Sequence, residues 1–173
     1  MENTIMEWIR SVLEITPRRW LSLVQVVPSN LLRLQPKAQE WGAIACLQHL
    51  VDTERWVFPK RVQFLLDEQD FPAFDPDTQG THSESTRKPI ELAEEFNLLR
   101  QGSLVLLRKV SPADLEKKAR HQELGLVTMS ELLHEWAAHD LMHTVQAEQA
   151  LMQPFIRGCG PWDKYFRAHD ARY

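Results

Sequence analysis

The chain has 173 residues, of which 43% are hydrophobic and 25% charged, and its formal net charge is −4. This composition is typical of folded globular proteins and excludes a disordered or fibrous chain. The slight acidic excess also argues against a nucleic-acid partner, because such binding needs clustered Lys and Arg. The length suits one domain, and we expect a single domain over 1–173.

The cysteines and the apolar stretches of the sequence indicate in which compartment the protein is expected. Cys46 and Cys159 lie far apart and form no CxxC pair, so neither a disulfide framework nor a thiolate zinc site is expected. No run of about 18 apolar residues occurs, and charges are spread through the first 30 residues. We therefore expect a cytoplasmic protein without a signal peptide, a membrane span or a membrane partner.

The first half of the chain predicts long helices. Only 6 glycines occur in the sequence, and apolar residues recur at three- and four-residue spacing, which favours an all-α fold. Thr16 and Pro17 are typical of a helix start, so we place a boundary there and the main first helix over 17–27. A second block predicts a helix over 40–66, which Pro59 should kink or divide in two.

The second half predicts a long loop and two further helices. Residues 69–88 are rich in Asp, Pro, Ser and Thr, and loops of this length are often functional. The next helix is expected over 89–110, with a proline at its first position. Thr128 and Glu131 form a capping-box pattern, which predicts that the last helix starts there and runs to about Met152.

Four helices with one long connection indicate an all-α four-helix bundle with one long crossover loop. We expect its core over about 16–152, with Pro154 just beyond the last helix. The C-terminal tail, 153–173, carries aromatic residues, and we expect it to pack back on the bundle.

Two histidines of the last predicted helix form the first candidate site. His139 and His143 are four residues apart, an offset of about 40° around a helix, so both rings project from one face. Such a pair is a weak signal alone. His49 lies inside the apolar middle of the predicted helix 40–66, and facing helices of a bundle meet in its core. Three imidazoles from two helices would leave open positions on a metal, as catalytic sites do; alternatively, His49 is a core histidine bonded to a backbone carbonyl.

The other histidines are expected outside this group. His134 is five residues before His139, about 140° away around the helix. We expect it to be solvated. His82, His121 and His169 fall in predicted loops or in the tail, and we expect them on the surface, with His121 at one end of the bundle core as the alternative.

Acidic residues near the histidines have several candidate roles. Glu135 and Asp52 are weak candidates for a general base acting on bound water, and the catalytic residue stays unassigned. Asp140 or Asp52 could instead orient a histidine ligand. For each, a solvated helix face is the alternative. Cys46, one turn before His49, could be a thiolate ligand or a small buried apolar side chain.

The order and spacing of these motifs resemble the DinB/YfiT-like family of four-helix-bundle metalloenzymes over about 16–150. The stretches that carry the resemblance are Glu40-Trp41-Gly42-Ala43, His49-Leu50-Val51-Asp52-Thr53-Glu54-Arg55-Trp56, Arg61, His121-x-x-Leu124-Gly125-x-Val127-Thr128 and His139-Asp140-x-x-His143-x-x-Gln146. The chain departs from the family pattern at Pro59 and in the tail, which carries no family motif.

The resemblance implies a divalent metal, zinc, nickel or iron, held by His49, His139 and His143, and a homodimer. It also implies a small-molecule substrate, since some relatives are S-transferases or isomerases that use low-molecular-weight thiols and others are hydrolases. We therefore expect a metal-dependent thiol S-transferase or hydrolase, with specificity set by the cavity and the 69–88 loop. The alternative is a non-catalytic, metal-binding, stress-related dimeric bundle protein.

Overall fold

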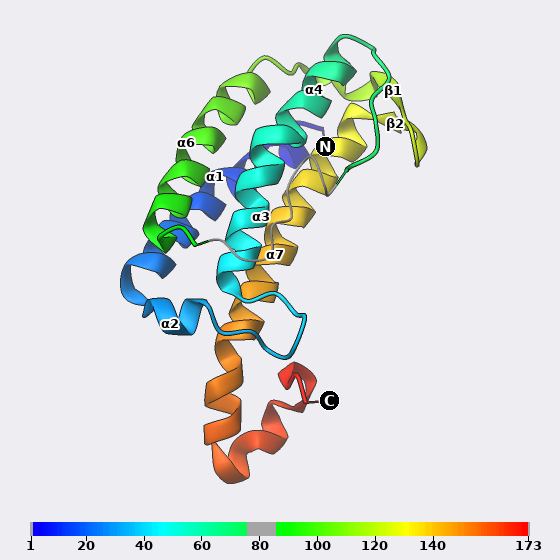
Figure 1. Ribbon diagram of the computed structural model, residues 1–173. Coiled ribbons are helices and arrows are strands. Elements are labelled where there is room, and N and C mark those ends of the chain that lie inside the picture. Colours follow the sequence, from blue (N-terminus) through cyan, green and yellow to red (C-terminus); the bar gives the residue numbers. More distant parts are fainter. Residues whose placement is uncertain (1, 76–85, 173) are drawn as a thin grey trace.

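The computed structural model describes residues 2–75 and 86–172 (Figure 1). Its long helices are α1 (Glu2–Val26), α3 (Ala43–Trp56), α4 (Phe58–Leu66), α6 (Pro89–Leu107) and α7 (Met129–Gly158). The shorter elements are α2 (Ser29–Leu32), strands β1 (Lys118–His121) and β2 (Gly125–Thr128), and the 3-10 turns Pro112–Glu116, Gly160–Tyr165 and Arg167–His169. None of the described helices is both long enough and apolar enough to cross a membrane.

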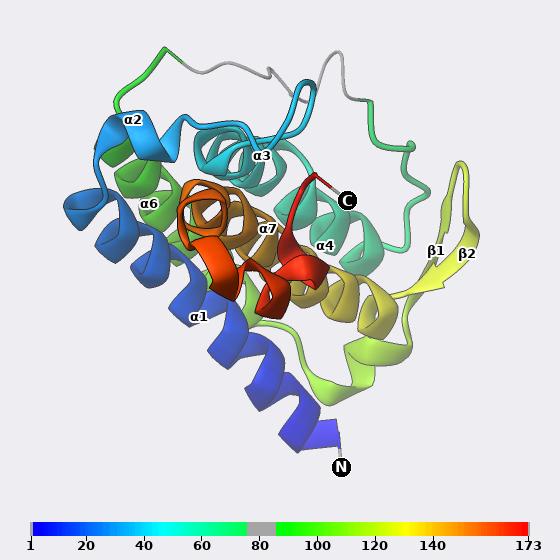
Figure 2. The same ribbon diagram turned by 90° about the horizontal axis from the view of Figure 1, so that it is seen from below.

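Four helical rods form the bundle, with α3 and α4 acting as one rod. α1 and α7 run in one direction, and α3, α4 and α6 run in the other (Figure 1). Each of α1 and α3 packs against both α6 and α7, and the view along the helices shows this arrangement (Figure 2). Because α4 and α6 run the same way, the chain between them must cross the length of the bundle. The prediction of a four-helix bundle with one long crossover is confirmed.

Two prolines do not end helices as the sequence predicted. α1 continues through Pro17, and α7 continues through Pro154, so both predicted boundaries are wrong. Pro17 has no N–H for the Leu13 carbonyl, but the Arg100 side chain donates to that oxygen at 2.7 Å instead. Pro59, in contrast, follows a break at Val57 that separates α3 from α4, as predicted.

The start of the second rod is set by a close backbone contact. A Cβ on Gly42 would lie 2.5 Å from the Leu34 carbonyl oxygen, so only glycine fits where the chain turns into α3. α3 therefore begins at Ala43, three residues later than the predicted boundary at residue 40.

A β-hairpin that the sequence analysis missed precedes α7. β1 and β2 pair antiparallel, and His121 lies opposite Gly125, whose φ of +79° favours glycine. Phe71 adds a short third segment, since its N–H donates to the Arg120 carbonyl and its carbonyl accepts from Gln122. The hairpin ends at Thr128, which caps α7 in the predicted box with Glu131.

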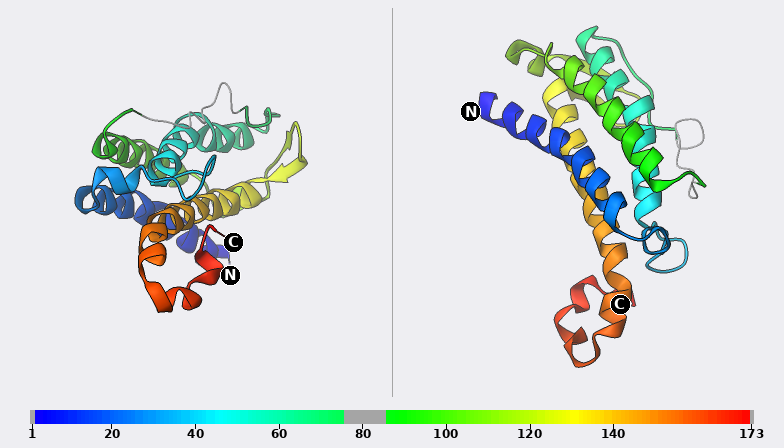
Figure 3. Two further views of the ribbon diagram at one scale, coloured as in Figure 1. Left: turned by 60° about the horizontal axis from the view of Figure 1, so that its bottom comes forward. Right: turned by 90° about the vertical axis from the view of Figure 1, so that its left-hand side faces the viewer.

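Two apolar clusters fill the core, one toward the hairpin and one toward α2, and polar residues lie between them. Phe58 and Trp136 belong to the first cluster, and Trp20 and Phe96 to the second. The end of α7 and the C-terminal turns extend past the bundle (Figure 3). The tail folds back on α7 rather than on the bundle core, because Gln153 bonds to the backbone of His169 and Ala171. The single domain over 1–173 stays a prediction.

Candidate metal centre

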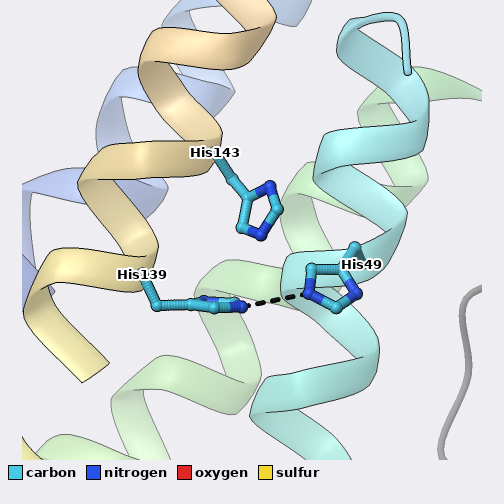
Figure 4. Close-up of side chains that lie close together, drawn as sticks. All are labelled: His49, His139 and His143. Atoms are coloured by element: carbon cyan, nitrogen blue, oxygen red, sulfur yellow. Dashed lines mark hydrogen bonds between the residues drawn. The ribbon is translucent and has the colours of Figure 1, made fainter. Parts of the chain in front are cut away.

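Three histidine rings converge between α3 and α7, with His49 and His143 buried and His139 partly buried. His49 projects from α3, and His139 and His143 project from successive turns of α7 (Figure 4). The Nε2 atoms of His49 and His139 are 3.0 Å apart, and one nitrogen from each of the three rings lies within 4.8 Å of the others. The structure thus brings together the three histidines that the sequence analysis singled out.

Hydrogen bonding leaves a lone pair of His143 available to a ligand. The Nδ1 of His143 lies 2.9 Å from the side-chain oxygen of Gln146, which can only accept. The proton is therefore on Nδ1, and Nε2 carries the lone pair. A second ring nitrogen that donates to an oxygen is the usual support of a metal-binding histidine.

Burial favours the neutral form of His139 and His143, which is the form that binds metals. Burial lowers the pKa of His139 to about 3, and the nearby His143, His49, Arg100 and Arg61 add to the shift. Burial also lowers the pKa of His143, although its bond to Gln146 opposes this. In their neutral form, His139 and His143 have no charge of their own to repel a cation.

The donor set fits a divalent ion. Two histidine nitrogens bound to one zinc ion at about 2.0–2.1 Å in tetrahedral geometry lie roughly 3.3 Å apart. The observed 3.0 Å between His49 and His139 is close to that value. The Nδ1 of His139 is also buried without a hydrogen-bond partner among the described residues. The Nδ1 of His139 thus lacks the acceptor that Gln146 provides for the Nδ1 of His143.

Aromatic rings surround the histidines. The ring of Trp41 lies 5.0 Å from His49 and 5.7 Å from His143, and Phe58 lies 5.0 Å from His139. Phe74, from the start of the crossover, meets His49 edge-on at 6.1 Å. An open groove of about 820 Å³ lies between Trp41 and the exposed face of α7, and His143 is part of its lining.

The other predicted site residues have different surroundings. Asp52 is buried and accepts two hydrogen bonds from the side chain of Gln48. Glu135 is half exposed, with its carboxylate 3.8 Å from Arg61. Cys46 is buried, which raises the pKa of its thiol to about 12, and its sulfur does not join the group of three histidine nitrogens.

One predicted alternative, that Asp140 orients a histidine ligand, is not what the structure shows. Asp140 forms a buried ion cluster with Arg100 and Glu54, because α6 places Arg100 between the two carboxylates. Arg100 makes five hydrogen bonds of 2.7–3.1 Å, to both oxygens of each carboxylate and to the Leu13 carbonyl. The carboxylates outweigh the effect of burial and raise the pKa of Arg100. Nothing in the spacing of these three residues identified this cluster.

The remaining histidines divide differently from the prediction. His134 and His169 are exposed, as expected, and His82 lies outside the described residues. His121 is only 5% exposed, so its placement on the surface was wrong. The alternation of exposed and buried residues along β1 buries Ala119 and His121 together, and this was the signal that could have found it.

A family model of the DinB superfamily matches residues 13–147. Among solved structures, the chain is similar to YfiT from Bacillus subtilis, which is described as a probable metal-dependent hydrolase with an unusual four-helix bundle topology. The TM-score is 0.72 at 17% identity, over 84% of this chain and 85% of that one. No curated protein matched the sequence. The chain belongs to the DinB superfamily.

Proposed function

We propose that this DinB-superfamily protein is a divalent-metal-dependent enzyme that acts on a small molecule, with His49, His139 and His143 as ligands of zinc, nickel or iron. The observation that carries the proposal is the convergence of three histidine ring nitrogens from α3 and α7. Among the described residues, no Cys, Asp or Glu joins this group as a fourth ligand. Three protein ligands and an open position are typical of catalytic rather than structural zinc sites.

A divalent ion in such a site acts as a Lewis acid and makes water or a thiol a good nucleophile at neutral pH. The protein's own side chains do the rest. Gln146 fixes the tautomer and orientation of His143, and Trp41, Phe58 and Phe74 exclude bulk water from the rings. This apolar surrounding strengthens electrostatic interactions with a bound substrate.

Hydrolysis is the leading reaction, and thiol S-transfer is the second candidate. The description of YfiT supports hydrolysis, for which Glu135, one turn before His139, and Asp52, one turn after His49, are the candidate bases. The absence of a carboxylate from the histidine group in the described part of the chain favours S-transfer instead. A thiol that binds a metal loses its proton without a neighbouring base, whereas a general base assists the attack of water.

A homodimer and a cytoplasmic location complete the proposal. Leu141, Met142 and Val145 are exposed on one side of α7, which supports a protein partner there. Both cysteines, Cys46 and Cys159, are free, which supports a reducing compartment.

Metal analysis of protein purified without a histidine tag tests the metal site. We expect one divalent ion per chain. Residues that only support a metal ligand change metal affinity by about 10- to 100-fold, so the loss of a ligand in His49→Ala or in His139→Ala should cost at least about 100-fold. His134→Ala is the matched control, since His134 is exposed on α7, the helix that also carries His139. Equal metal binding by His49→Ala and His134→Ala would contradict the proposal.

A second measurement separates the enzyme from a non-catalytic metal protein. With cobalt in place of the native ion, the visible spectrum should change when a small thiol is added, because an open position accepts the thiolate. An unchanged spectrum would favour the non-catalytic alternative. Turnover of small esters and amides, compared with thiol conjugation, then distinguishes the two reactions.

A further inference from the structure

Besides Arg100, a second largely buried cation, Arg61, lies near the histidine cluster. Arg61 follows Phe58 by one turn on α4, and Glu135 precedes His139 by one turn on α7. The Arg61 side chain is only 12% exposed and lies against the ring of Phe71. Its charge is near enough to lower the pKa of His139.

Arg61 is poorly compensated for a buried cation. Its nearest described carboxylate is that of Glu135, at 3.8 Å, which is too long for a hydrogen bond, and that side chain is 52% exposed. Its only described side-chain hydrogen bond is to the Nε2 of His121, at 3.2 Å. Burial lowers the pKa of Arg61 and Glu135 only opposes this, whereas the pKa of Arg100 is raised.

His121 cannot neutralise the guanidinium. The backbone N–H groups of Glu123 and Leu124 both donate to its Nδ1 at 3.1 Å, and Arg61 approaches its Nε2. A neutral imidazole has one lone pair for hydrogen bonding, so these three donors compete for it. An imidazolium would have no acceptor among them. Because Arg61 shares this one lone pair with two backbone N–H groups, His121 leaves the guanidinium short of an acceptor.

One short segment covers both Arg61 and the histidines. Phe71 packs on Arg61 and His121, and Phe74 packs on His49. Arg61 also lies 3.8 Å from Glu135, one turn before His139, and its charge acts on His139, so we take the cation and the histidine nitrogens to be within reach of one small molecule.

We infer that Arg61 is a substrate-binding residue that takes a carboxylate, so that the substrate of the histidine site carries a carboxylate a few bonds from its reacting group. This inference rests on the proposed function, because that function makes the histidine site the place where the substrate's reacting group binds. A guanidinium matches a carboxylate with two parallel hydrogen bonds, and the substrate's carboxylate would come closer to Arg61 than the half-exposed Glu135 does at 3.8 Å.

Binding of a matched pair of thiols to the cobalt-loaded protein tests the inference. The probes are 3-mercaptopropionate and its neutral amide, and the thiolate-to-cobalt absorption reports binding of either. A hydrogen bond to a charged group contributes about 1.5–3 kcal/mol, so we expect the acid to bind roughly 10- to 100-fold more tightly than the amide. Arg61→Gln should abolish this preference, and Arg61→Lys should keep part of it.

Arg120→Gln is the control, because Arg120 is an exposed cation of the adjacent strand. It should keep the full preference. Equal binding of acid and amide by the natural protein, or a preference that survives in Arg61→Gln, would overturn the inference.

Failure of the proposed function gives a different result. If the protein takes up no cobalt, that function is wrong, and titration of the metal-free protein with propionate and propionamide decides the inference. A shift of the Arg61 Nε–H resonance with propionate alone would support it, and no shift would overturn it.

Discussion

The bundle holds two buried polar clusters side by side, and they differ in how far the protein satisfies its own side chains. In the ion cluster, Arg100 makes five hydrogen bonds to Glu54, Asp140 and a backbone carbonyl. In the histidine cluster, the nitrogens of His49 and His139 face each other at 3.0 Å, although only one of two such atoms can donate. Every charge of the first cluster has a partner, whereas in the second cluster the Nδ1 of His139 has none among the described residues.

The neighbouring positions of His139 and Asp140 make this contrast direct. They are consecutive on α7, so one helix presents His139 to α3 and Asp140 to Arg100 on α6. The ion cluster holds α3, α6 and α7 together at the level where the histidines need a fixed spacing. The ion cluster therefore gives rigidity to the proposed metal site, as a functional site requires of its support.

Removal of the cation should have the largest effect on stability. Arg100→Met leaves the carboxylates of Glu54 and Asp140 buried without a partner, and we expect a loss of about 3–5 kcal/mol in the free energy of unfolding. Denaturant unfolding measures it. Arg108→Met, at an exposed position of the same region, should change stability by less than about 0.5 kcal/mol. Similar values for the two variants would mean that the ion cluster does not hold the bundle together.

Loss of the support of His143 should affect metal binding rather than stability. Gln146→Leu removes the acceptor of the His143 Nδ1 proton, and we expect metal affinity to fall about 10- to 100-fold. Competition with a chelator measures this. Gln149→Leu, an exposed position one turn further along α7, should bind metal as the natural protein does. If both variants bind equally well, His143 does not depend on Gln146.

Acid should destabilise the metal-free protein through the histidine cluster. Unfolded His139 takes up a proton near its ordinary pKa of 6.5, but folded His139 does so only near about 3. Between these values the unfolded state binds more protons, so stability present above pH 6.5 is lost as the pH falls, by up to about 1.4 kcal/mol per pH unit.

A comparison of two variants separates the pH dependence caused by His139 from that caused by the carboxylates. His139→Gln should flatten the dependence of unfolding free energy on pH in that window, and His134→Gln, at an exposed position, should not. Parallel curves for His139→Gln and the natural protein would show that burial does not hold His139 neutral.

Local patterns of the sequence predicted the histidine cluster well. The offset of His139 and His143 is fixed within one helix, whose start was visible in the Thr128 capping box. His49 was then predicted from its apolar surroundings and the pairing of facing helices. The ion cluster gave no such signal, because Glu54, Arg100 and Asp140 each resemble ordinary charges of a solvated helix face. Their burial depends on packing between three helices.

The hairpin and the course of α1 were missed for related reasons. β1 and β2 have four residues each, which is too short for a clear alternation, and Phe71 joins them from 47 residues earlier than Lys118. Proline usually ends a helix because it has no N–H to donate to the carbonyl four residues earlier. The helix can continue where another group donates to that carbonyl instead. That group is Arg100, which the sequence places far from Pro17.

The substitution Pro17→Ala tests whether Arg100 compensates for the proline, and it should have the smallest effect. Proline inside a helix costs about 3 kcal/mol relative to alanine. At this position the Leu13 carbonyl already accepts from Arg100 at 2.7 Å, so a new N–H would compete with it. We therefore expect Pro17→Ala to raise the free energy of unfolding by less than about 1 kcal/mol.

Pro154→Ala is the matched case, since α7 also passes through a proline there and no described side chain donates to the carbonyl one turn before it. It should stabilise the protein more than Pro17→Ala does. In an Arg100→Met background, the Leu13 carbonyl has no side-chain donor, and the gain from Pro17→Ala should rise toward that of Pro154→Ala. Denaturant unfolding of the four variants measures this coupling. An unchanged gain would show that the proline and the ion cluster are independent, and that α1 passes Pro17 for another reason.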